Sequence, residues 1–464
     1  MRYLYPRLAA FGVALSALFT SGRAAEPIRP NIIFIMADDL GYGDLGSYGQ
    51  TKIPTPHLDQ LAAEGLRFTQ AYAGSTVCAP SRNVLMTGRH TGHIEVRGNL
   101  KVGLRSSDET VASVLKSAGY ATGIVGKWGL GYEGTDAVPT QKGFDFFFGY
   151  LDQTHAHNSY PSFLYRNEER ITLPNVVPDE GKYGQGVATV RRTHSEDLFM
   201  TEAMGFIERH RDAPFYLYLP VTLPHANNEA GDDGMEAPPD SPRDFIDPSW
   251  PKPERDFAAT VARLDADVGR IMAQLDELGI ADHTLLVFTS DNGPHAEGGH
   301  DPAFFNSGGG LRGVKRDLYE GGVRIPLIAR WPGQIAPATT TPQVTSFADF
   351  LPTFAALAGA PSSAIPAHDG IDLTDALHGH ASSRDDAHTL YWEFYEGTSA
   401  QAIRFENWKA VRIPMFTGPI ELYDLTNDVA ETHDLAADHP AEVARADRLM
   451  AAAHVPNPLW KAPN

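Results

Sequence analysis

Polar side chains follow four predicted strands that lie far apart in this 464-residue sequence. In open α/β sheets, ligands bind beyond the carboxyl ends of the strands, so we expect these side chains to meet at one edge of a sheet. The four strands and the residues that follow them are 31–37 with Asp38 and Asp39, 121–125 with Lys127, 215–221 with His225, and 284–289 with Asp291 and Asn292.

The acidic members of this set predict a bound cation. Asp38, Asp39 and Asp291 would repel one another strongly in a partly buried site, and a divalent cation removes that repulsion. Carboxylate and amide oxygens suit calcium better than zinc, while magnesium, which also takes carboxylates, remains an alternative. Taken singly, each short motif is also typical of an ordinary turn or helix cap.

The single cysteine, Cys78, lies in the segment STVCAPSR at 75–82. Pro80 predicts the start of a short helix over 81–86, which places Cys78 at a helix N-terminus, where anions are favoured. Arg82 follows by one helical turn and would share the same face. A nucleophile and an arginine at such a point suit a sulfate or phosphate group. The alternative is that a lone cysteine is a small buried apolar residue.

Apolar runs alternate with helical patterns along most of the chain. Most runs are continuous, which is typical of strands covered on both faces, and the alternation predicts a mainly parallel α/β sheet flanked by helices. A further strand is expected at 325–329, and helices at 56–64, 110–118, 195–209 and 257–278. The stretch 226–253, rich in Pro, Asp and Gly, is expected to be a long surface loop.

The N-terminal residues are typical of a secretory signal. Arg2 and Arg7 precede an apolar run over 8–19, and Gly22-Arg23-Ala24 offers small residues for cleavage, so we predict a signal peptide over 1–24. The apolar run is too short to cross a bilayer. We therefore expect an exported protein, periplasmic or extracellular, with no integral membrane segment in the mature chain. A retained N-terminal anchor is the alternative.

Near residue 387 the pattern changes to short alternating strands, at 390–395, 400–405, 408–413 and 421–424, before a final helix at 440–454. We predict a catalytic α/β domain over 25–386 and a smaller subdomain of antiparallel sheet plus helix over 387–464. Lys and Arg total 38 against 58 Asp and Glu, a net charge of −20. This charge argues against nucleic acid as a partner, and an anionic substrate would need a locally positive pocket.

The order of these motifs resembles that of the formylglycine-dependent (type I) sulfatases of the alkaline-phosphatase-like superfamily. Cys78-Ala79-Pro80-Ser81-Arg82 matches their Cys-x-Pro-x-Arg motif, and the likeness covers nearly the whole mature chain. The other matching segments are MADDLGYGDLG at 36–46, GKWGLG at 126–131, the Pro224-His225 pair, SDNG at 290–293, LRGVKRDLYEGGVRIP at 311–326 and ELYDLTNDVAETHDLA at 421–436.

This resemblance implies an alkaline-phosphatase-like fold and hydrolysis of sulfate esters. Cys78 would be oxidised to formylglycine (3-oxoalanine) by a formylglycine-generating or anaerobic maturation enzyme before folding, and the hydrated aldehyde would be the nucleophile. One Ca²⁺ ion would be bound by Asp38, Asp39, Cys78, Asp291 and Asn292. The expected catalytic residues are Cys78 itself, Arg82 and Lys127 to orient the hydrate, Lys315 to hold the sulfate, and His225 to protonate the departing alcohol oxygen.

The segment THAHNSYPSFLYRNEE at 154–169 resembles those of bacterial polysaccharide sulfatases, which implies a sulfated carbohydrate substrate, a polysaccharide or oligosaccharide. Many relatives carry histidine two residues after the lysine, where this chain has Gly129. His155 or His157 could replace that histidine, contact the substrate, or simply lie at the surface. Aromatic residues that could stack on sugars, with core packing as the alternative, are Tyr160, Phe163, Tyr165 and Trp250.

Two other functions fit the same motifs. A phosphomonoester or phosphonate hydrolase could share the fold, because a fold alone does not fix the ester. Such enzymes often carry two metals, whereas this sequence offers one clear ligand set. A non-catalytic binder of sulfated glycans is the second alternative, and Gly129 is the only residue that favours it.

Overall fold

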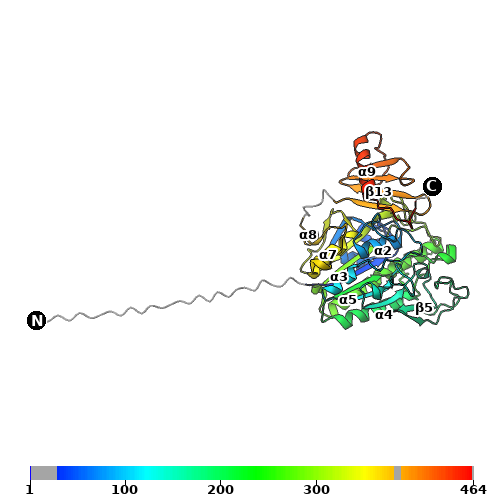
Figure 1. The fold of residues 1–464 in the computed structure, drawn as a ribbon. Helices are drawn as coiled ribbons and strands as arrows, with labels where there is room; N and C mark the ends of the chain where they lie inside the picture. The colour runs from blue at the N-terminus through cyan, green and yellow to red at the C-terminus, as the bar shows by residue number, and fades with distance from the viewer. Residues whose placement is uncertain (2–28, 381–387, 462–464) are drawn as a thin grey trace.

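The computed structural model of this chain describes residue 1 and residues 29–380 and 388–461. The predicted signal peptide lies outside the described residues apart from residue 1. Figure 1 shows a central sheet between layers of helices, with a second, smaller sheet and helix α9 (Pro440–Ala453), orange to red, stacked against one end of the core.

The central sheet has eleven strands and is mixed but mainly parallel around its middle, as the sequence predicted. Strand β1 (Asn31–Ala37) lies between β7 (Phe215–Pro220) and β8 (Thr284–Ser290), and both pairs are parallel. Strand β3 (Ala121–Lys127) continues the parallel set beyond β7. Strand β9 (Arg324–Arg330) differs, because it runs antiparallel to β8. The order is β10-β2-β9-β8-β1-β7-β3-β4-β5-β6, with β11 paired to β2.

The alternating side chains of β1 explain why its whole sequence is apolar. Ile32 and Phe34 pack into the core on one face, with residues of helices α2 (Cys78–Thr87), α3 (Val111–Ser117) and α7 (Phe350–Ala358). Ile33 and Ile35 pack into a separate core on the other face, with helices α1 (Pro56–Ala63), α4 (Ser195–His210) and α5 (Lys252–Glu277). A strand with helices on both faces has no polar side, which is what a continuous apolar run indicates.

Several elements were not predicted. Helix α7 is one, and the strands are β2 (Leu66–Tyr72), β4 (Phe146–Tyr150), β5 (Phe163–Arg166), β6 (Glu169–Thr172), β10 (Thr339–Thr341) and β11 (Thr345–Ser346). The stretch 226–253 contains a short 3-10 turn and the first residues of α5, and otherwise no helix or strand.

The C-terminal sheet is antiparallel, in the order β12 (Leu390–Phe394), β13 (Ala400–Phe405), β14 (Trp408–Arg412) and β15 (Ile420–Asp424). One of its faces packs against the core, where Trp392 donates a hydrogen bond of 3.0 Å from Nε1 to the carbonyl of Ala73. Trp392 also belongs to the apolar cluster that contains Val77, the residue before Cys78. The small sheet therefore supports the loop that leads to Cys78.

Among the residues that the structure describes, we find no helix with the length and apolar composition needed to cross a bilayer.

Candidate active site

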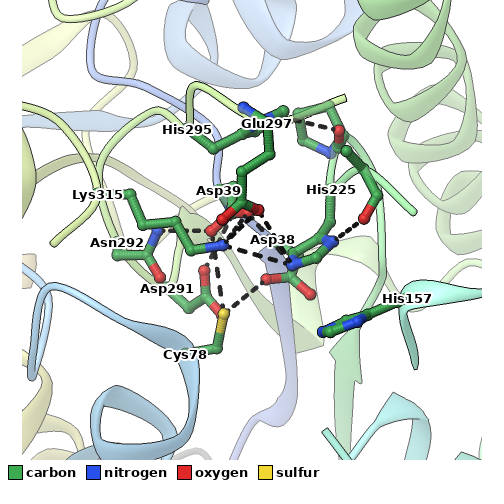
Figure 2. Close-up of polar contacts among 12 residues, drawn as sticks. Asp38, Asp39, Cys78, His157, His225, Asp291, Asn292, His295, Glu297 and Lys315 are labelled. Atoms are coloured by element: carbon green, nitrogen blue, oxygen red, sulfur yellow. Dashed lines mark hydrogen bonds and ion pairs between the residues drawn. The ribbon is translucent and has the colours of Figure 1, made fainter. Parts of the chain in front are cut away.

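The parallel strands bring the predicted acids and His225 together at one edge of the sheet, where Cys78 and Lys315 also lie (Figure 2). Asp38 and Asp39 follow the last residue of β1, and Asp291 and Asn292 follow the last residue of β8. Lys127 is itself the last residue of β3, since that strand is two residues longer than predicted. Asp39 has a positive φ of 69°, a conformation that a non-glycine residue adopts at a cost. This backbone turn belongs to the site, not to a solvated loop.

Each of the three buried carboxylates contacts a cationic side chain. Lys127 Nζ lies 2.6 Å from Asp38 Oδ2. Arg82 Nη2 lies 2.7 Å from Asp291 Oδ2. Lys315 Nζ lies 2.8 Å from Asp39 Oδ2. The locally positive groups that an anionic substrate needs are thus at the same edge as the acids.

These cations do not fully compensate the electrostatic repulsion between the three carboxylates. Burial raises the pKa of Asp291 to about 7, with Asp38 as the next cause, even though Arg82 opposes the rise. Burial acts the same way on Asp38 and Asp39, but Lys127 and Lys315 respectively hold their pKa values below the usual range. The raised pKa of Asp291 indicates that the three cations leave part of the repulsion between the acids uncompensated, so these residues fit a further positive charge.

The donor set fits a hard divalent cation. The buried Oδ1 atom of Asn292 has no hydrogen-bond partner among the described residues, while its Nδ2 donates to Asp39 Oδ1 at 2.7 Å. An amide oxygen left free beside three carboxylates is a ready ligand. The ligand atoms of Asp38, Asp39, Cys78 and His225 lie within 4.8 Å of one another. With Asp291 and Asn292 added, four of the six candidate ligand residues offer oxygen, which favours calcium or magnesium over zinc.

Cys78 is the first residue of α2, three residues earlier than the predicted helix start. Its Sγ lies 3.2 Å from Asp38 Oδ1 and 3.9 Å from Asp39 Oδ1, and the residue is fully buried. Burial and the charge of Asp291 raise the pKa of the thiol well above its usual value. An unmodified thiol here stays protonated and is a poor nucleophile. The side chain is buried, but against the acids and not in an apolar interior.

His225 faces the same cluster from the loop after β7. Its Nδ1 donates a hydrogen bond of 2.6 Å to the carbonyl of Ala226, so Nε2 carries the lone pair of the neutral ring. Nε2 lies 3.4 Å from both Lys315 Nζ and Asp39 Oδ2. Burial and Lys315 lower the pKa of His225 to about 3. The imidazole is therefore neutral in this state.

Three residues that the sequence did not single out complete the cluster. Glu297 Oε2 lies 3.0 Å from Lys315 Nζ, and Glu297 Oε1 lies 2.7 Å from Arg316 Nη1. The His295 ring is roughly parallel to that of His225, with ring centroids 6.3 Å apart. His295 and Glu297 follow Asn292 by only three and five residues. This closeness in the sequence was the one feature that could have placed them in the site.

The two histidines of the 154–169 segment lie in different surroundings. His157 stacks on His225 (Figure 2), and its Nδ1 lies 3.3 Å from the Glu229 carboxylate. His155 is fully buried, with its ring 4.9 Å from that of Tyr150 and 4.5 Å from that of Phe163. Only His157 faces the residues around Cys78.

Comparison with known proteins agrees with the geometry. Residues 30–360 match the family model described as Sulfatase, and residues 313–451 match the one described as N-sulphoglucosamine sulphohydrolase, C-terminal.

The chain belongs to the sulfatase family.

Human arylsulfatase A is 37% identical to this sulfatase over 396 residues, which are 80% of this chain and 71% of that protein. An N-acetylgalactosamine-6-O-sulfatase of Bacteroides thetaiotaomicron is 32% identical over 497 residues, 91% of this chain and 92% of that protein. The crystal structure of Ps i-CgsB in complex with k-i-k-neocarrahexaose gives a TM-score of 0.75 at 26% identity, covering 91% of this chain and 92% of that one. The predicted family, fold class and enzyme type are thereby confirmed.

A side chain at Gly129 of this sulfatase would require the end of the Gln153 side chain to shift. The φ of Gly129 is 73°, and a Cβ atom there would lie 2.7 Å from Gln153 Oε1 and 3.6 Å from Arg82 Cδ. Gln153 is buried, and its side-chain oxygen points toward this glycine. The glycine and the glutamine are thus sterically matched.

Proposed function

We propose that this sulfatase removes sulfate from a sulfated carbohydrate, with Cys78 converted to formylglycine and with one bound calcium ion. The observation that carries the proposal is the position of Cys78 Sγ, 3.2 Å from Asp38 among three acids and three cations. Two relatives support a carbohydrate substrate. One is named for N-acetylgalactosamine 6-O-sulfate, and the other was crystallised with a neocarrahexaose.

The cation would be held by residue 78 with Asp38, Asp39, Asp291 and Asn292. When bound, a calcium ion supplies Lewis-acid chemistry: it draws charge from a sulfate oxygen and lowers the pKa of a hydroxyl on residue 78. Its charge would also keep Asp291 ionised at neutral pH, because an opposite charge nearby stabilises the carboxylate.

The basic side chains divide between nucleophile and substrate. Lys127 and Arg82, held by Asp38 and Asp291, would orient the hydroxyl groups of a hydrated aldehyde at residue 78. Lys315 would bind the sulfate group. His225 is neutral in the free protein, and the negative charge of a bound sulfate would raise its pKa so that Nε2 could carry a proton to the leaving oxygen. A hydrate is needed because its second hydroxyl can expel sulfate and restore the aldehyde.

Burial of Cys78 bears on when the modification occurs. The side chain is 0% exposed, so an oxidising enzyme could reach it only in an unfolded or nascent chain. We therefore propose a formylglycine-generating or anaerobic maturation enzyme as a transient partner before folding. Export to the periplasm or the extracellular space remains a prediction from the N-terminal sequence.

Mass spectrometry of the tryptic peptide 68–82 tests the proposal most directly. Formylglycine replaces one sulfur and two hydrogens of Cys78 by one oxygen, so the modified peptide has a lower and defined mass. An unmodified thiol after expression in the native host would favour the alternative of a glycan binder. Parallel assays with a sulfate ester and its phosphate analogue distinguish the second alternative, since faster turnover of the phosphate would indicate a phosphomonoester hydrolase.

A further inference from the structure

A cavity lies next to His155 in the 155–157 turn, whose other histidine, His157, contacts the candidate active site. The cavity has a volume of about 300 Å³, which is the lower end of the size range of small-molecule sites. Its lining includes Lys101, Tyr132, Asp152, Arg170, Lys182 and Tyr183. None of these residues contributes to the cluster around Cys78.

Two short connections join this cavity to the reaction centre. His155 lines the cavity while His157, two residues later in the same 3-10 turn, stacks on His225. On the other side, the loop that carries Lys101 also carries Asn99, whose Oδ1 accepts a hydrogen bond of 3.1 Å from the backbone N–H of Ala79 in α2. The cavity and the residues around Cys78 thus lie on either side of the 155–157 turn, which contributes a residue to each.

The cavity presents aromatic rings next to fixed cations. Lys101 Nζ lies 3.9 Å from the centroid of the Tyr183 ring and 5.6 Å from that of Tyr132, and the two rings are 6.0 Å apart. The buried Asp152 fixes Lys101, with 2.7 Å between Nζ and Oδ2. Both tyrosines are only half-buried, so their rings remain available to a ligand. Tyrosine rings beside ordered polar groups suit the mixed apolar and polar faces of a sugar.

The cavity is lined by more cationic than acidic side chains, whereas the whole molecule has a net negative charge. Lys101 is paired with Asp152, and Arg170 with Glu133. Lys182 is exposed and forms no ion pair within the part of the chain that the structure describes; its Nζ lies 5.0 Å from the centroid of the Tyr183 ring. On a protein of net charge −20, an uncompensated lysine at a tyrosine-lined cavity favours an anionic ligand.

We propose that this cavity is a subsite for the neighbouring, negatively charged sugar of a glycan whose sulfated residue lies at Cys78. The inference rests on the proposed function and extends it: the substrate is at least a disaccharide with two anionic groups. Tyr183 and Tyr132 bind the ring, and Lys182 pairs with a sulfate or carboxylate on it.

The test compares substrates of two sizes. Wild type and Lys182→Ala are assayed with a small aryl sulfate and with two tetrasaccharides, one in which sulfated sugars alternate with uronates and one with sulfates but no carboxylate. We expect Lys182→Ala to lower kcat/KM for at least one tetrasaccharide about fivefold to tenfold, the range of one charge-assisted contact. The aryl sulfate should change less than about twofold. The tetrasaccharide that is affected identifies the anion.

Matched variants separate this role from general damage. Tyr183→Ala should reproduce the selective loss and Tyr183→Phe should retain most activity, because the ring is kept. Lys116→Ala is the control, since Lys116 is exposed on α3, whose last turn lies just before the start of β3, at the opposite edge of the sheet from the site. Equal losses on all substrates, or no loss on either tetrasaccharide, would overturn the proposal.

Binding measurements keep the two proposals distinct. The dissociation constant of each tetrasaccharide is measured by calorimetry for wild type and for Lys182→Ala. If wild type hydrolyses no sulfate ester but its tetrasaccharide affinity falls severalfold in Lys182→Ala, the subsite stands and the proposed activity fails. If wild type hydrolyses the aryl sulfate and the affinities are equal, the subsite fails and the activity stands.

Discussion

His157 lies parallel to His225, with 5.2 Å between the ring centroids and 15° between the ring planes. The His157 ring contacts the Glu229 carboxylate. The Nε2 atom of His225 points toward Lys315 and Asp39. The stack fixes the plane of the imidazole that faces the reaction centre. His157 is therefore a positioning residue for His225 in the proposed mechanism.

Replacing His157 tests that relationship. His157→Ala removes the stack and should lower kcat/KM about tenfold, since an aromatic pair contributes about 0.5–1.5 kcal/mol. His157→Phe should retain most of the activity. If His157 instead acts as a base in place of the histidine missing at 129, His157→Phe would be as slow as the alanine variant, and mass spectrometry would detect sulfated enzyme at residue 78.

His155 offers the contrasting case. Because it packs among Tyr150 and Phe163 in the interior, His155→Ala should lower Tm by several degrees and leave the kcat of the folded enzyme for a small aryl sulfate nearly unchanged. Thermal unfolding followed by circular dichroism measures the first effect, and assays well below Tm measure the second. A large fall in kcat at unchanged Tm would contradict the placement of His155 in the core.

Removal of the metal should be visible without any assay of turnover. Calcium that binds only the folded chain stabilises it by about 2.7 kcal/mol at a hundredfold excess over Kd, so a chelator should lower Tm and calcium should restore it. Asn292→Ala removes the free amide oxygen and should weaken this response strongly, whereas Asn292→Asp should preserve it. A wild-type Tm that is insensitive to both chelator and calcium would remove the metal site from the proposal.

The contact between Gly129 and Gln153 predicts that a change at residue 153 can offset the loss of stability caused by a side chain at residue 129. Gly129→His places a side chain on a backbone with φ of 73° and against Gln153 Oε1, so it should destabilise the fold by about 1–3 kcal/mol. Adding Gln153→Gly should recover the steric part of that loss. Denaturant unfolding of the two single variants and the double variant gives the coupling energy, and strictly additive losses would show that the two positions are independent.

Glu196 should make the stability of the protein fall as the pH rises. Burial and Asp267 raise its pKa to about 8, against an ordinary 4.5. Between these values the unfolded chain releases the proton and the folded chain keeps it, so the free energy of unfolding falls with rising pH by up to about 1.4 kcal/mol per unit. Glu196→Gln should therefore be more stable than wild type at pH 8 and no more stable at pH 4.5. The same stability difference at both pH values would contradict a buried, protonated Glu196.

The sequence predicted most accurately the parts of this fold that are buried on both sides. Strands β1, β7 and β8 were placed to within one residue, because a short unbroken apolar run is typical of a strand that is covered on both faces. Strand β2 was missed because Arg67, Thr69 and Gln70 interrupt its apolar residues. Short edge strands such as β11 carry no periodic signal at all.

The residues of the candidate site were likewise most predictable from the sequence where they follow or end a buried strand. Asp38, Lys127 and Asp291 were predictable because each follows or ends a buried strand, and the ends of parallel strands meet. Glu297 and Gln153 lie in loops, where only the tertiary structure decides which side chain turns inward. His155 and His157 have the same side chain and are two residues apart, yet one packs in the core and the other faces the reaction centre.

The hydrogen bond from Trp392 to Ala73 and the packing of the small sheet around Val77 can form only after β12–β15 have been synthesised. More than three hundred residues separate Cys78 from the strand that closes over its loop, so the cysteine emerges long before its cover exists. At about 5–20 residues per second this delay amounts to tens of seconds. This delay would give the proposed maturation enzyme time to act on Cys78, and a variant permuted to make β12–β15 first would shorten it.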